Sequence, residues 1–221
     1  MKNENDIFVF YTTTNLGCFN ALLSKNENLL SQDLKKKILS YKFLKDKALA
    51  LYGILLLQMG LKHFKYPLSY IKKLKHTNHG KPYINHDFEF NISHSSNMTV
   101  CAFSKNNKLG IDLQKKKNIE LKNFKNNLND SIYSEIKSSK NPHETFFNYW
   151  TKLESLLKAD GRGFFIDSKN IYFQDNKGFI NKKQQYFISK IDLHDEFICH
   201  IAYEKKNSSI TIEKKVFTNF N

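Results

Sequence analysis

The first half of the chain combines strand-forming runs with a long helical pattern. Residues 7–12 (IFVFYT) are rich in strand formers and predict an opening strand. Residues 29–61 carry a helical pattern that begins near Ser31, a typical N-cap residue. The predicted buried face of this helix consists of the apolar residues Leu34, Ile38, Leu49 and Leu56. Three consecutive antiparallel strands, separated by polar turns, are then predicted at 88–92, 99–103 and 109–113.

The second half again combines a helix with several strands. Residues 115–129 are polar and rich in lysine, which predicts a mobile connection. Residues 143–159 predict a helix that ends with Gly161 in the C-cap position. Strands are predicted at 171–173, 186–193, 197–203 and 210–217, with a hairpin turn at 176–178. The pattern therefore predicts an α+β fold with an N-terminal half, 1–106, and a C-terminal half, 107–221.

Composition indicates a globular protein with a preference for acidic partners. The 221 residues are 40% hydrophobic and 14% aromatic, enough to form a sizeable core. The charge balance of +14 favours an acidic or phosphate-bearing partner, although a general bias towards Lys and Asn also explains part of it. Every cation except Arg162 is a lysine, which cannot make the bidentate contact that reads guanine. We therefore expect no specific nucleic acid.

Cysteine usage and apolar runs indicate a cytoplasmic protein. Cys18, Cys101 and Cys199 form an odd set without C-x-x-C spacing, which predicts neither a disulfide framework nor a zinc ribbon. The uninterrupted apolar run at 48–57 is too short to span a bilayer, and the first residues lack a signal-peptide pattern. We expect no membrane contact.

Candidate chemistry is concentrated in three polar segments, at 80–95, 109–114 and 147–163. Glu154 and Lys158 lie one helical turn apart, although such pairs more often only decorate a surface. Asp112 at a strand end is often no more than a turn cap, and His94 is more often a structural histidine than a ligand contact. An Asp and a Glu from two separate elements are nevertheless the oxygen ligands that Mg²⁺ takes, and a nearby lysine would neutralise a diphosphate.

The ordered motifs GKPYI (80–84), FNISHS (90–95), LGIDLQ (109–114) and WTKLESLLKADGRG (150–163) resemble those of the surfactin-type 4'-phosphopantetheinyl transferases. The resemblance implies two pseudo-twofold related α+β halves, with coenzyme A and Mg²⁺ in the cleft between them. It implies that Asp112 and Glu154 bind the metal, that Glu154 acts as the base and that Lys158 contacts the coenzyme A phosphates. It further implies that Lys81, Ser93 and His94 contact coenzyme A phosphates.

The chain departs from the family pattern at three positions. Gln114 replaces a glutamate that many members carry two residues after the aspartate, so the metal site loses one negative charge. Leu153 replaces a lysine before the glutamate, and Lys152 lies one position earlier, about 100° away around the helix. Leu49 stands where an arginine often binds the nucleotide, for which Lys45 or Lys47 would substitute.

The implied reaction is attack by a serine of an apo acyl, peptidyl or polyketide carrier protein on the β-phosphate of coenzyme A. It releases adenosine 3',5'-bisphosphate and requires no covalent enzyme intermediate. Because both halves of the cleft lie in one chain, we expect a monomer. Two alternatives stay open: a noncatalytic basic RNA-binding module, and a degenerate family member that binds coenzyme A without transfer.

Overall fold

The computed structural model describes residues 6–84, 87–181 and 183–218. The elements of the N-terminal half are β1 (Ile7–Thr13), η1 (Leu16–Cys18), α1 (Phe19–Lys25), η2 (Glu27–Leu29), α2 (Gln32–Ser40), α3 (Leu44–His63), η3 (Leu68–Lys73), β2 (Lys75–His76), β3 (Pro82–Tyr83), β4 (Glu89–Ser95) and β5 (Met98–Ser104). Those of the C-terminal half are β6 (Leu109–Lys115), η4 (Leu121–Asn127), α4 (Asp130–Ser138), α5 (Pro142–Asp160), η5 (Gly163–Phe165), η6 (Ser168–Asn170), β7 (Ile171–Gln174), β8 (Lys177–Ile180), β9 (Gln184–Lys190), β10 (Phe197–Tyr203) and β11 (Ile210–Lys214).

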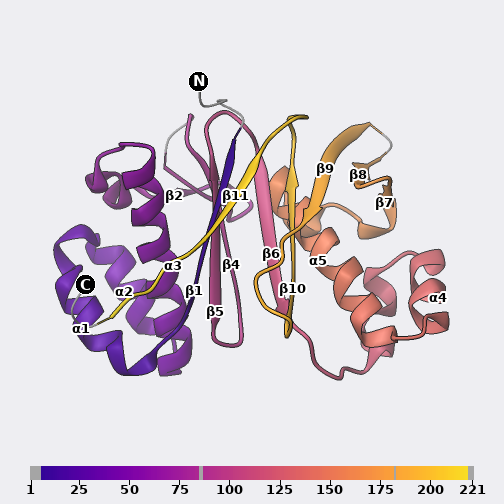
Figure 1. The fold of residues 1–221 in the computed structure, drawn as a ribbon, viewed down its shortest axis with the longest axis horizontal. Helices are drawn as coiled ribbons and strands as arrows, with labels where there is room; N and C mark the ends of the chain where they lie inside the picture. Colours follow the sequence, from indigo (N-terminus) through magenta and orange to yellow (C-terminus); the bar gives the residue numbers. More distant parts are fainter. Residues whose placement is uncertain (1–5, 85–86, 182, 219–221) are drawn as a thin grey trace.

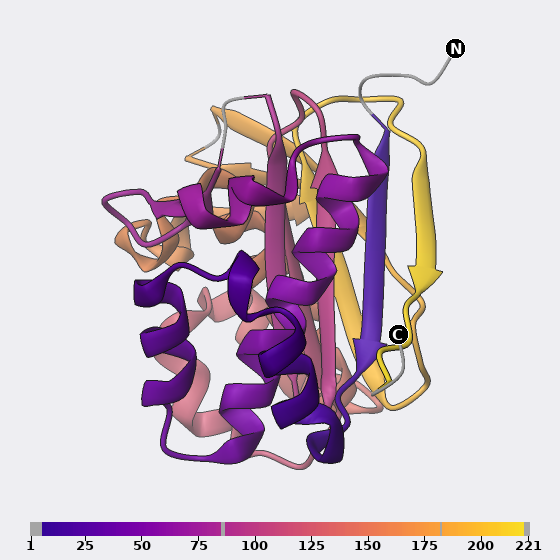
Figure 2. The same cartoon turned by 90° about the vertical axis from the view of Figure 1, so that its left-hand side faces the viewer.

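Two sheets lie at the centre of the molecule, and helices cover the outer face of each (Figure 1). The N-terminal sheet has the order β11-β1-β5-β4, with α3 against its outer face (Figure 2). The C-terminal sheet has the order β6-β10-β9-β8-β7, with α5 against its outer face. No helix in the described part of the chain is long and apolar enough to cross a bilayer.

Strand alternation supplies three apolar clusters that hold these layers together: one beneath α3, one beneath α5 and one between the two sheets. In β1, Phe8 and Phe10 join the cluster beneath α3, whereas Ile7 and Val9 join a cluster between the two sheets. The residues of β6 that face the other sheet are Leu109, Ile111 and Leu113. The opposite face of β6, which carries Asp112, therefore lies towards α5.

Both halves repeat one topology, which confirms the predicted two-half α+β fold. The series β1, α3, β4 and β5 corresponds to β6, α5, β9 and β10. In each sheet the last strand of the series lies between the other two. β11 then pairs in parallel with β1, so the end of the chain returns to the N-terminal sheet. The exact boundary at 106/107 stays a prediction.

Three local predictions were wrong: two concern features that the local sequence does not mark, and the third places a hairpin turn one residue too late. The helical pattern at 29–61 forms two helices, since the backbone is extended at Tyr41 and Phe43; Ser31 does cap α2 by accepting from Leu34 N. β6 pairs with β10 in the other sheet rather than with β5. The hairpin turn is made by Asp175 and Asn176, and it introduces β8, which the prediction lacked.

The segment predicted to be a mobile connection is ordered in part. It contains η4, and the Phe124 ring lies edge-on to Trp150 at 5.3 Å between ring centroids. Ile119 and Leu121 also pack against the cluster beneath α5. A few apolar side chains among the lysines are therefore enough to anchor this segment.

Gly110 sets the distance between β6 and α5. A Cβ at this position would lie 2.2 Å from Ala159 N and 2.3 Å from Ser155 O, both backbone atoms of α5. A backbone contact of this kind cannot be relieved by a side-chain rotation. The close approach of strand and helix therefore requires glycine.

We predict that Gly110→Ala lowers the free energy of unfolding by at least about 2 kcal/mol, because α5 must move away from β6. Denaturant unfolding measures the change. Gly17→Ala is the matched control, since its Cβ would meet only the Asn15 side chain, at 3.3 Å. Equal effects of the two substitutions would contradict the close-packing account.

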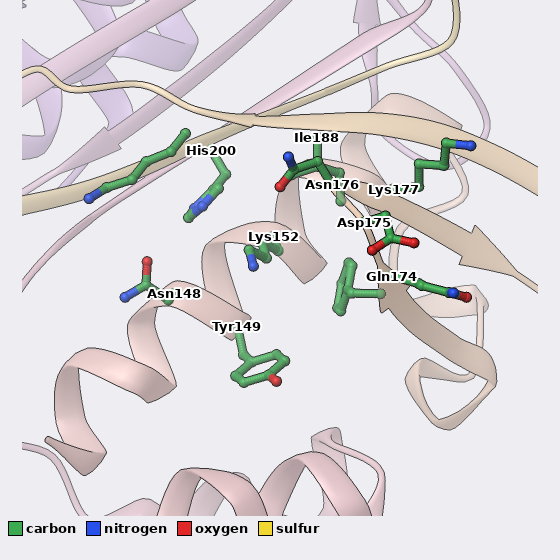
Figure 3. Close-up of a pocket in the computed structure, with 11 residues that line it drawn as sticks. Asn148, Tyr149, Lys152, Gln174, Asp175, Asn176, Lys177, Ile188 and His200 are labelled. Carbon is green, nitrogen blue, oxygen red and sulfur yellow. The ribbon is translucent and has the colours of Figure 1, made fainter. Parts of the chain in front are cut away.

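His200 is a buried histidine between β10 and α5. It is 3% exposed, and its Nδ1 lies 2.7 Å from Thr151 Oγ1. Burial lowers the pKa of His200 to about 3, and the charges of Lys152 and Lys190 act in the same direction. His200 and Lys152 line one cavity (Figure 3). The imidazole is therefore neutral near pH 7.

We predict that His200 makes the protein acid-sensitive. The pKa of His200 in the unfolded chain is near 6.5, so between pH 6.5 and 3 the unfolded state binds more protons than the folded state. As the pH is lowered through this range, the free energy of unfolding therefore falls by about 1.4 kcal/mol per pH unit. This contribution is fully retained above pH 6.5. Unfolding free energies from pH 7 to 4.5 should decline less steeply in His200→Asn than in the parent. Parallel curves would contradict the prediction.

Candidate active site

Side chains of β4 join the two halves next to the candidate site. Asn91 Oδ1 accepts from Ile111 N at 2.9 Å, Ser93 Oγ from Leu113 N at 3.3 Å, and Ser95 Oγ from Lys115 N at 2.9 Å. We call these three contacts the β4–β6 seam. They replace a backbone ladder, because β4 and β6 are end strands of different sheets. The seam fixes β4 alongside β6 in a single register.

Sequence reasoning gave no role to Asn91 or Ser95. The signal for them was the alternation of Asn, Ser and Ser in the strand-forming motif 90–95, which places all three side chains on one face. Three short polar side chains on one face of a buried strand require partners. The amides of β6 supply those partners.

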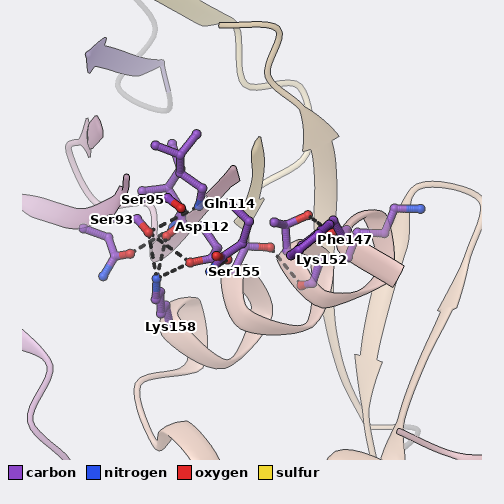
Figure 4. A network of polar contacts seen from close by, with 12 residues as sticks. Ser93, Ser95, Asp112, Gln114, Phe147, Lys152, Ser155 and Lys158 are labelled. Atoms are coloured by element: carbon purple, nitrogen blue, oxygen red, sulfur yellow. Dashed lines mark hydrogen bonds and ion pairs between the residues drawn. The ribbon is translucent and has the colours of Figure 1, made fainter. Parts of the chain in front are cut away.

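Asp112 is the centre of a buried polar network at this seam (Figure 4). It is 2% exposed. Its Oδ1 accepts from Ser93 Oγ at 3.0 Å and from Lys158 Nζ at 2.6 Å, and its Oδ2 accepts from Gln114 Nε2 at 3.3 Å. The carboxylate is thus held by residues of β4, β6 and α5.

Lys158 is the counter-charge of Asp112. Its Nζ also donates to Ser93 Oγ and to Ile111 O, each at 3.2 Å. The ammonium therefore contacts both halves of the molecule. A charge pair this buried is stabilising only while both partners are present.

Glu154 lies one turn before Lys158 on α5 and is half-buried. Burial raises the pKa of Glu154; the Lys158 ammonium opposes the rise and the negative charge of Asp112 adds to it. The charges of Asp112 and Lys158 both act on the Glu154 carboxyl, which therefore lies in the electrostatic field of that ion pair. A carboxylate with a raised pKa is a better proton acceptor than an ordinary glutamate.

The donor set fits a hard divalent cation. Asp112 and Glu154 offer carboxylate oxygens from two elements, and the Gln114 amide lies beside Asp112. Within the described residues no group of three His, Cys, Asp or Glu side chains forms a complete cage. Mg²⁺ suits such a site, because it is usually held by one or two carboxylates and keeps waters that phosphates replace.

Ser93 and His94 occupy different places although they are neighbours in the sequence. Ser93 is buried within the Asp112 network, whereas His94 is exposed on the other face of β4. His94 borders a cavity of about 220 Å³ whose basic groups also include Lys37 and His76. Partial desolvation lowers the pKa of His94, and the charge of Lys158 acts in the same direction.

Two predicted cofactor-binding lysines lie outside the Asp112 network. Lys81 Nζ donates to Leu109 O at 3.2 Å and Ala159 O at 3.3 Å, so it links its loop to β6 and α5. Lys47 lies half-buried in the first turn of α3. Their predicted contacts with coenzyme A stay predictions.

The departures next to Glu154 have simple structural consequences. Leu153 belongs to the apolar cluster beneath α5, so this position is occupied by core packing. Lys152 lies instead on the side of α5 that borders the His200 cavity. The ring of Trp150 stacks on Phe146 with 5.6 Å between centroids, in keeping with a structural role.

Comparison with known proteins identifies the class of enzyme. The model of the N-terminal domain of 4'-phosphopantetheinyl transferase matches residues 20–106, and that of the 4'-phosphopantetheinyl transferase superfamily matches residues 108–211. The chain is 30% identical over 189 residues to the 4'-phosphopantetheinyl transferase gsp of Aneurinibacillus migulanus, covering 82% of this chain and 77% of that protein. It is 35% identical over 92 residues to Sfp of Bacillus subtilis strain 168, covering 40% and 41%.

A related protein of Bacillus subtilis, also named 4'-phosphopantetheinyl transferase, is 33% identical over 63% of this chain and 66% of its own length. Both halves of the chain thus match a family of group-transfer enzymes. The chain belongs to the 4'-phosphopantetheinyl transferase superfamily and is a transferase of the surfactin type. This membership favours the transferase over an RNA-binding module.

We predict that Lys158→Gln lowers the free energy of unfolding by about 2 kcal/mol or more, because Asp112 is left buried without a counter-charge. The measurement is denaturant unfolding at pH 7 with a chelator present. Adding Asp112→Asn to this variant should recover part of the loss, since the unpaired charge is then gone. Strictly additive losses would contradict the charge pairing.

Proposed function

We propose that the chain transfers 4'-phosphopantetheine from coenzyme A to a serine of an apo acyl, peptidyl or polyketide carrier protein. The reaction is Mg²⁺-dependent and releases adenosine 3',5'-bisphosphate. The observation that supports the proposal is the contact between Lys158 Nζ and Asp112 Oδ1 at 2.6 Å beside the β4–β6 seam. Glu154 lies one turn before Lys158 on α5, and the charges of both Asp112 and Lys158 act on its pKa. Family membership supplies the type of reaction.

In this proposal Asp112, Glu154 and Gln114 would hold Mg²⁺. Gln114 presents its amide nitrogen to Asp112, and rotation of the amide would present the oxygen instead. When bound, the ion supplies positive charge to the diphosphate oxygens. The missing acidic side chain at position 114 makes Asp112 and Glu154 the two charged ligands.

The protein's own side chains then account for charge and proton transfer. The serine Oγ forms a bond to the β-phosphorus, and the bond from that phosphorus to the bridging oxygen breaks. Lys158 stabilises negative charge on the departing phosphate. Glu154 takes the serine proton, a role supported by its raised pKa.

The nucleotide of coenzyme A has a fitting surface on the N-terminal half. The cavity bordered by His94 combines an apolar wall from α2 and α3 with the basic side chains of Lys37 and His76. A base and a phosphate require this combination of surfaces. Lys81, Ser93 and Lys47 would then contact phosphates that run from this cavity towards Lys158.

The protein's charge suits an acidic carrier protein, and its cysteines suit the cytoplasm. A net charge of +14 would steer an acidic partner towards the site, an effect that salt weakens. Cys18, Cys101 and Cys199 are free and buried, which supports a reducing compartment. We propose that the enzyme acts there as a monomer.

We predict that incubation with coenzyme A, Mg²⁺ and a panel of apo carrier proteins produces a carrier whose mass has increased by one phosphopantetheine. Asp112→Asn and Glu154→Gln should each reduce the rate by at least about a hundredfold, because charge stabilisation and proton removal both depend on them. Intact-mass spectrometry measures the product, and a chelator should abolish it.

Glu144→Gln is the matched control for this assay. It removes a carboxylate from the first turn of the same helix, about 15 Å from Glu154 along the axis, and should leave the rate within about twofold. If the protein binds coenzyme A but transfers phosphopantetheine to no carrier, it is a degenerate member of the family. The departures at Gln114 and Leu153 motivate this alternative. Full activity in both site variants would refute the metal assignment.

A further inference from the structure

The cavity bordered by His94 carries basic groups from three separate elements. Its volume is about 220 Å³, and apolar side chains such as Leu49 and Ile54 of α3 form most of its lining. Lys37 lines it from α2, His76 from β2 and His94 from β4. A cavity with an apolar wall and several basic groups suits a ligand that has both a flat ring and an anionic group.

Lys37 and His76 contact each other at this cavity. The distance from Lys37 Nζ to His76 Nε2 is 3.3 Å, although the residues are 39 positions apart in the sequence. An ammonium can only donate, so Nε2 accepts and the His76 ring is neutral in this contact. Both side chains are exposed to solvent, which leaves the pair open to a ligand. The two basic groups therefore converge on one point.

No carboxylate neutralises this pair. Within residues 6–84, 87–181 and 183–218, no Asp or Glu side chain lies at ion-pair distance from Lys37 or His76. Asp33 lies one turn before Lys37 on α2, and it forms no ion pair with Lys37. An anion that bound between Lys37 and His76 would therefore have no carboxylate to displace.

On its other side, His76 borders a cavity of about 560 Å³. The titratable side chains that also line this cavity are His79, Lys81, Tyr83, Glu89, Lys108, Asp160 and Arg162. Lys81 Nζ lies 3.7 Å from Glu89 Oε2, and Arg162 Nε lies 2.6 Å from Asp160 Oδ1. Most of these charges are therefore neutralised locally.

The protonation state of His76 can respond to a bound anion. Partial desolvation lowers the pKa of His76, and the charge of Lys37 acts in the same direction, so the ring is neutral near pH 7 in the free protein. A phosphate dianion beside the ring favours the imidazolium. Protonated Nε2 then becomes a donor next to Lys37.

The remaining titratable side chains at the first cavity are His94 and Tyr41. Partial desolvation lowers the pKa of His94; the charge of Lys158 acts in the same direction, whereas those of Asp46 and Asp112 oppose it. His94 can therefore contribute to a pH effect at this cavity, and a substitution at position 76 is needed to separate the two histidines.

Leu49 connects the Lys37–His76 pair with a departure from the family pattern. Leu49 stands where an arginine often binds the nucleotide, and it lines the same cavity as Lys37 and His76. Neither Lys45 nor Lys47 is among the side chains that line it. Lys37 and His76 are therefore better placed than those two lysines to supply the missing positive charge.

We propose that Lys37 and His76 select a 3'-phosphate on the nucleotide of the donor, and that His76 takes up a proton when this phosphate binds. The phosphate oxygens would accept from Lys37 Nζ and from protonated His76 Nε2, and the apolar wall would contact the adenosine. Coenzyme A would thereby be preferred over 3'-dephospho-coenzyme A, more strongly as the pH falls from 8.5 to 7. Because the donor is coenzyme A only in the proposed function, this selection rests on that function.

The test compares adenosine 3',5'-bisphosphate with adenosine 5'-phosphate, which lacks only the 3'-phosphate. Each is titrated calorimetrically into the full chain with a chelator present, at pH 7 and pH 8.5, where a phosphate monoester is mainly a dianion. The bisphosphate should bind at least about tenfold more tightly at pH 7, because two charge-assisted contacts are added, and the ratio should fall at pH 8.5. Titrations at pH 7 in two buffers of different ionisation enthalpy should show net proton uptake when the bisphosphate binds.

His76→Gln should lower the bisphosphate preference at pH 7 at least about threefold and remove most of the proton uptake, because the glutamine side chain does not titrate. Lys37→Gln should lower the preference at both pH values. The matched controls, His79→Gln and Lys36→Gln, change exposed neighbours on the same segments and should leave the preference within about twofold. Thermal unfolding of each variant verifies that it is folded.

Two results would overturn the proposal. One is a His76→Gln variant with the bisphosphate preference and proton uptake of the parent. The other is an equal loss of preference in Lys36→Gln and Lys37→Gln, which would show only a nonspecific charge effect. If either result accompanies transfer of phosphopantetheine from coenzyme A, the proposed function stands and only the 3'-phosphate selection is refuted. If neither nucleotide binds and no carrier protein gains mass, both are refuted.

Discussion

The β4–β6 seam is the interaction on which the site depends. Edge strands of two different sheets leave backbone amides without a ladder, and buried amides require acceptors. Asn91, Ser93 and Ser95 supply them from every second position of β4. The register that satisfies these amides also brings Ser93 against Asp112. The same contacts therefore join the two halves and position the Asp112 carboxylate.

Strand alternation explains why the site forms on the α5 side of β6. Odd-numbered residues of β6 pack between the sheets, which leaves Gly110 and Asp112 facing the helix. Gly110 lets the backbone of α5 approach closely, and Lys158 then reaches Asp112 at 2.6 Å. Gly110 thus sets the distance between β6 and α5, and Asp112, two positions later, forms an ion pair across that distance.

The sequence could predict the elements that have local signals. The helix ending at Gly161, which has a φ of 92°, carries such a signal, and so do the motifs that contain Asp112 and Glu154. The sheet to which β6 belongs could not be predicted, because its alternation would suit either sheet. The break after α2 has no Gly or Pro to mark it. Both features depend on contacts between distant segments, which one local pattern does not encode.

On helix α5, a lysine placed one position earlier than in many family members puts its charge on a different side of the helix. A lysine directly before Glu154 would occupy the position of Leu153, which is buried in the core beneath the helix. At position 152 the lysine is turned by about 100°, towards His200 rather than into that core. The helix therefore carries cations on two separate sides: Lys158 is neutralised by Asp112, whereas Lys152 has no carboxylate at ion-pair distance within the described chain. The nearby negative charge of Glu135 and the face of the Tyr149 ring, 5.7 Å from Lys152 Nζ to the ring centroid, offset the Lys152 charge, so the displaced lysine is accommodated without contributing to the Asp112 network.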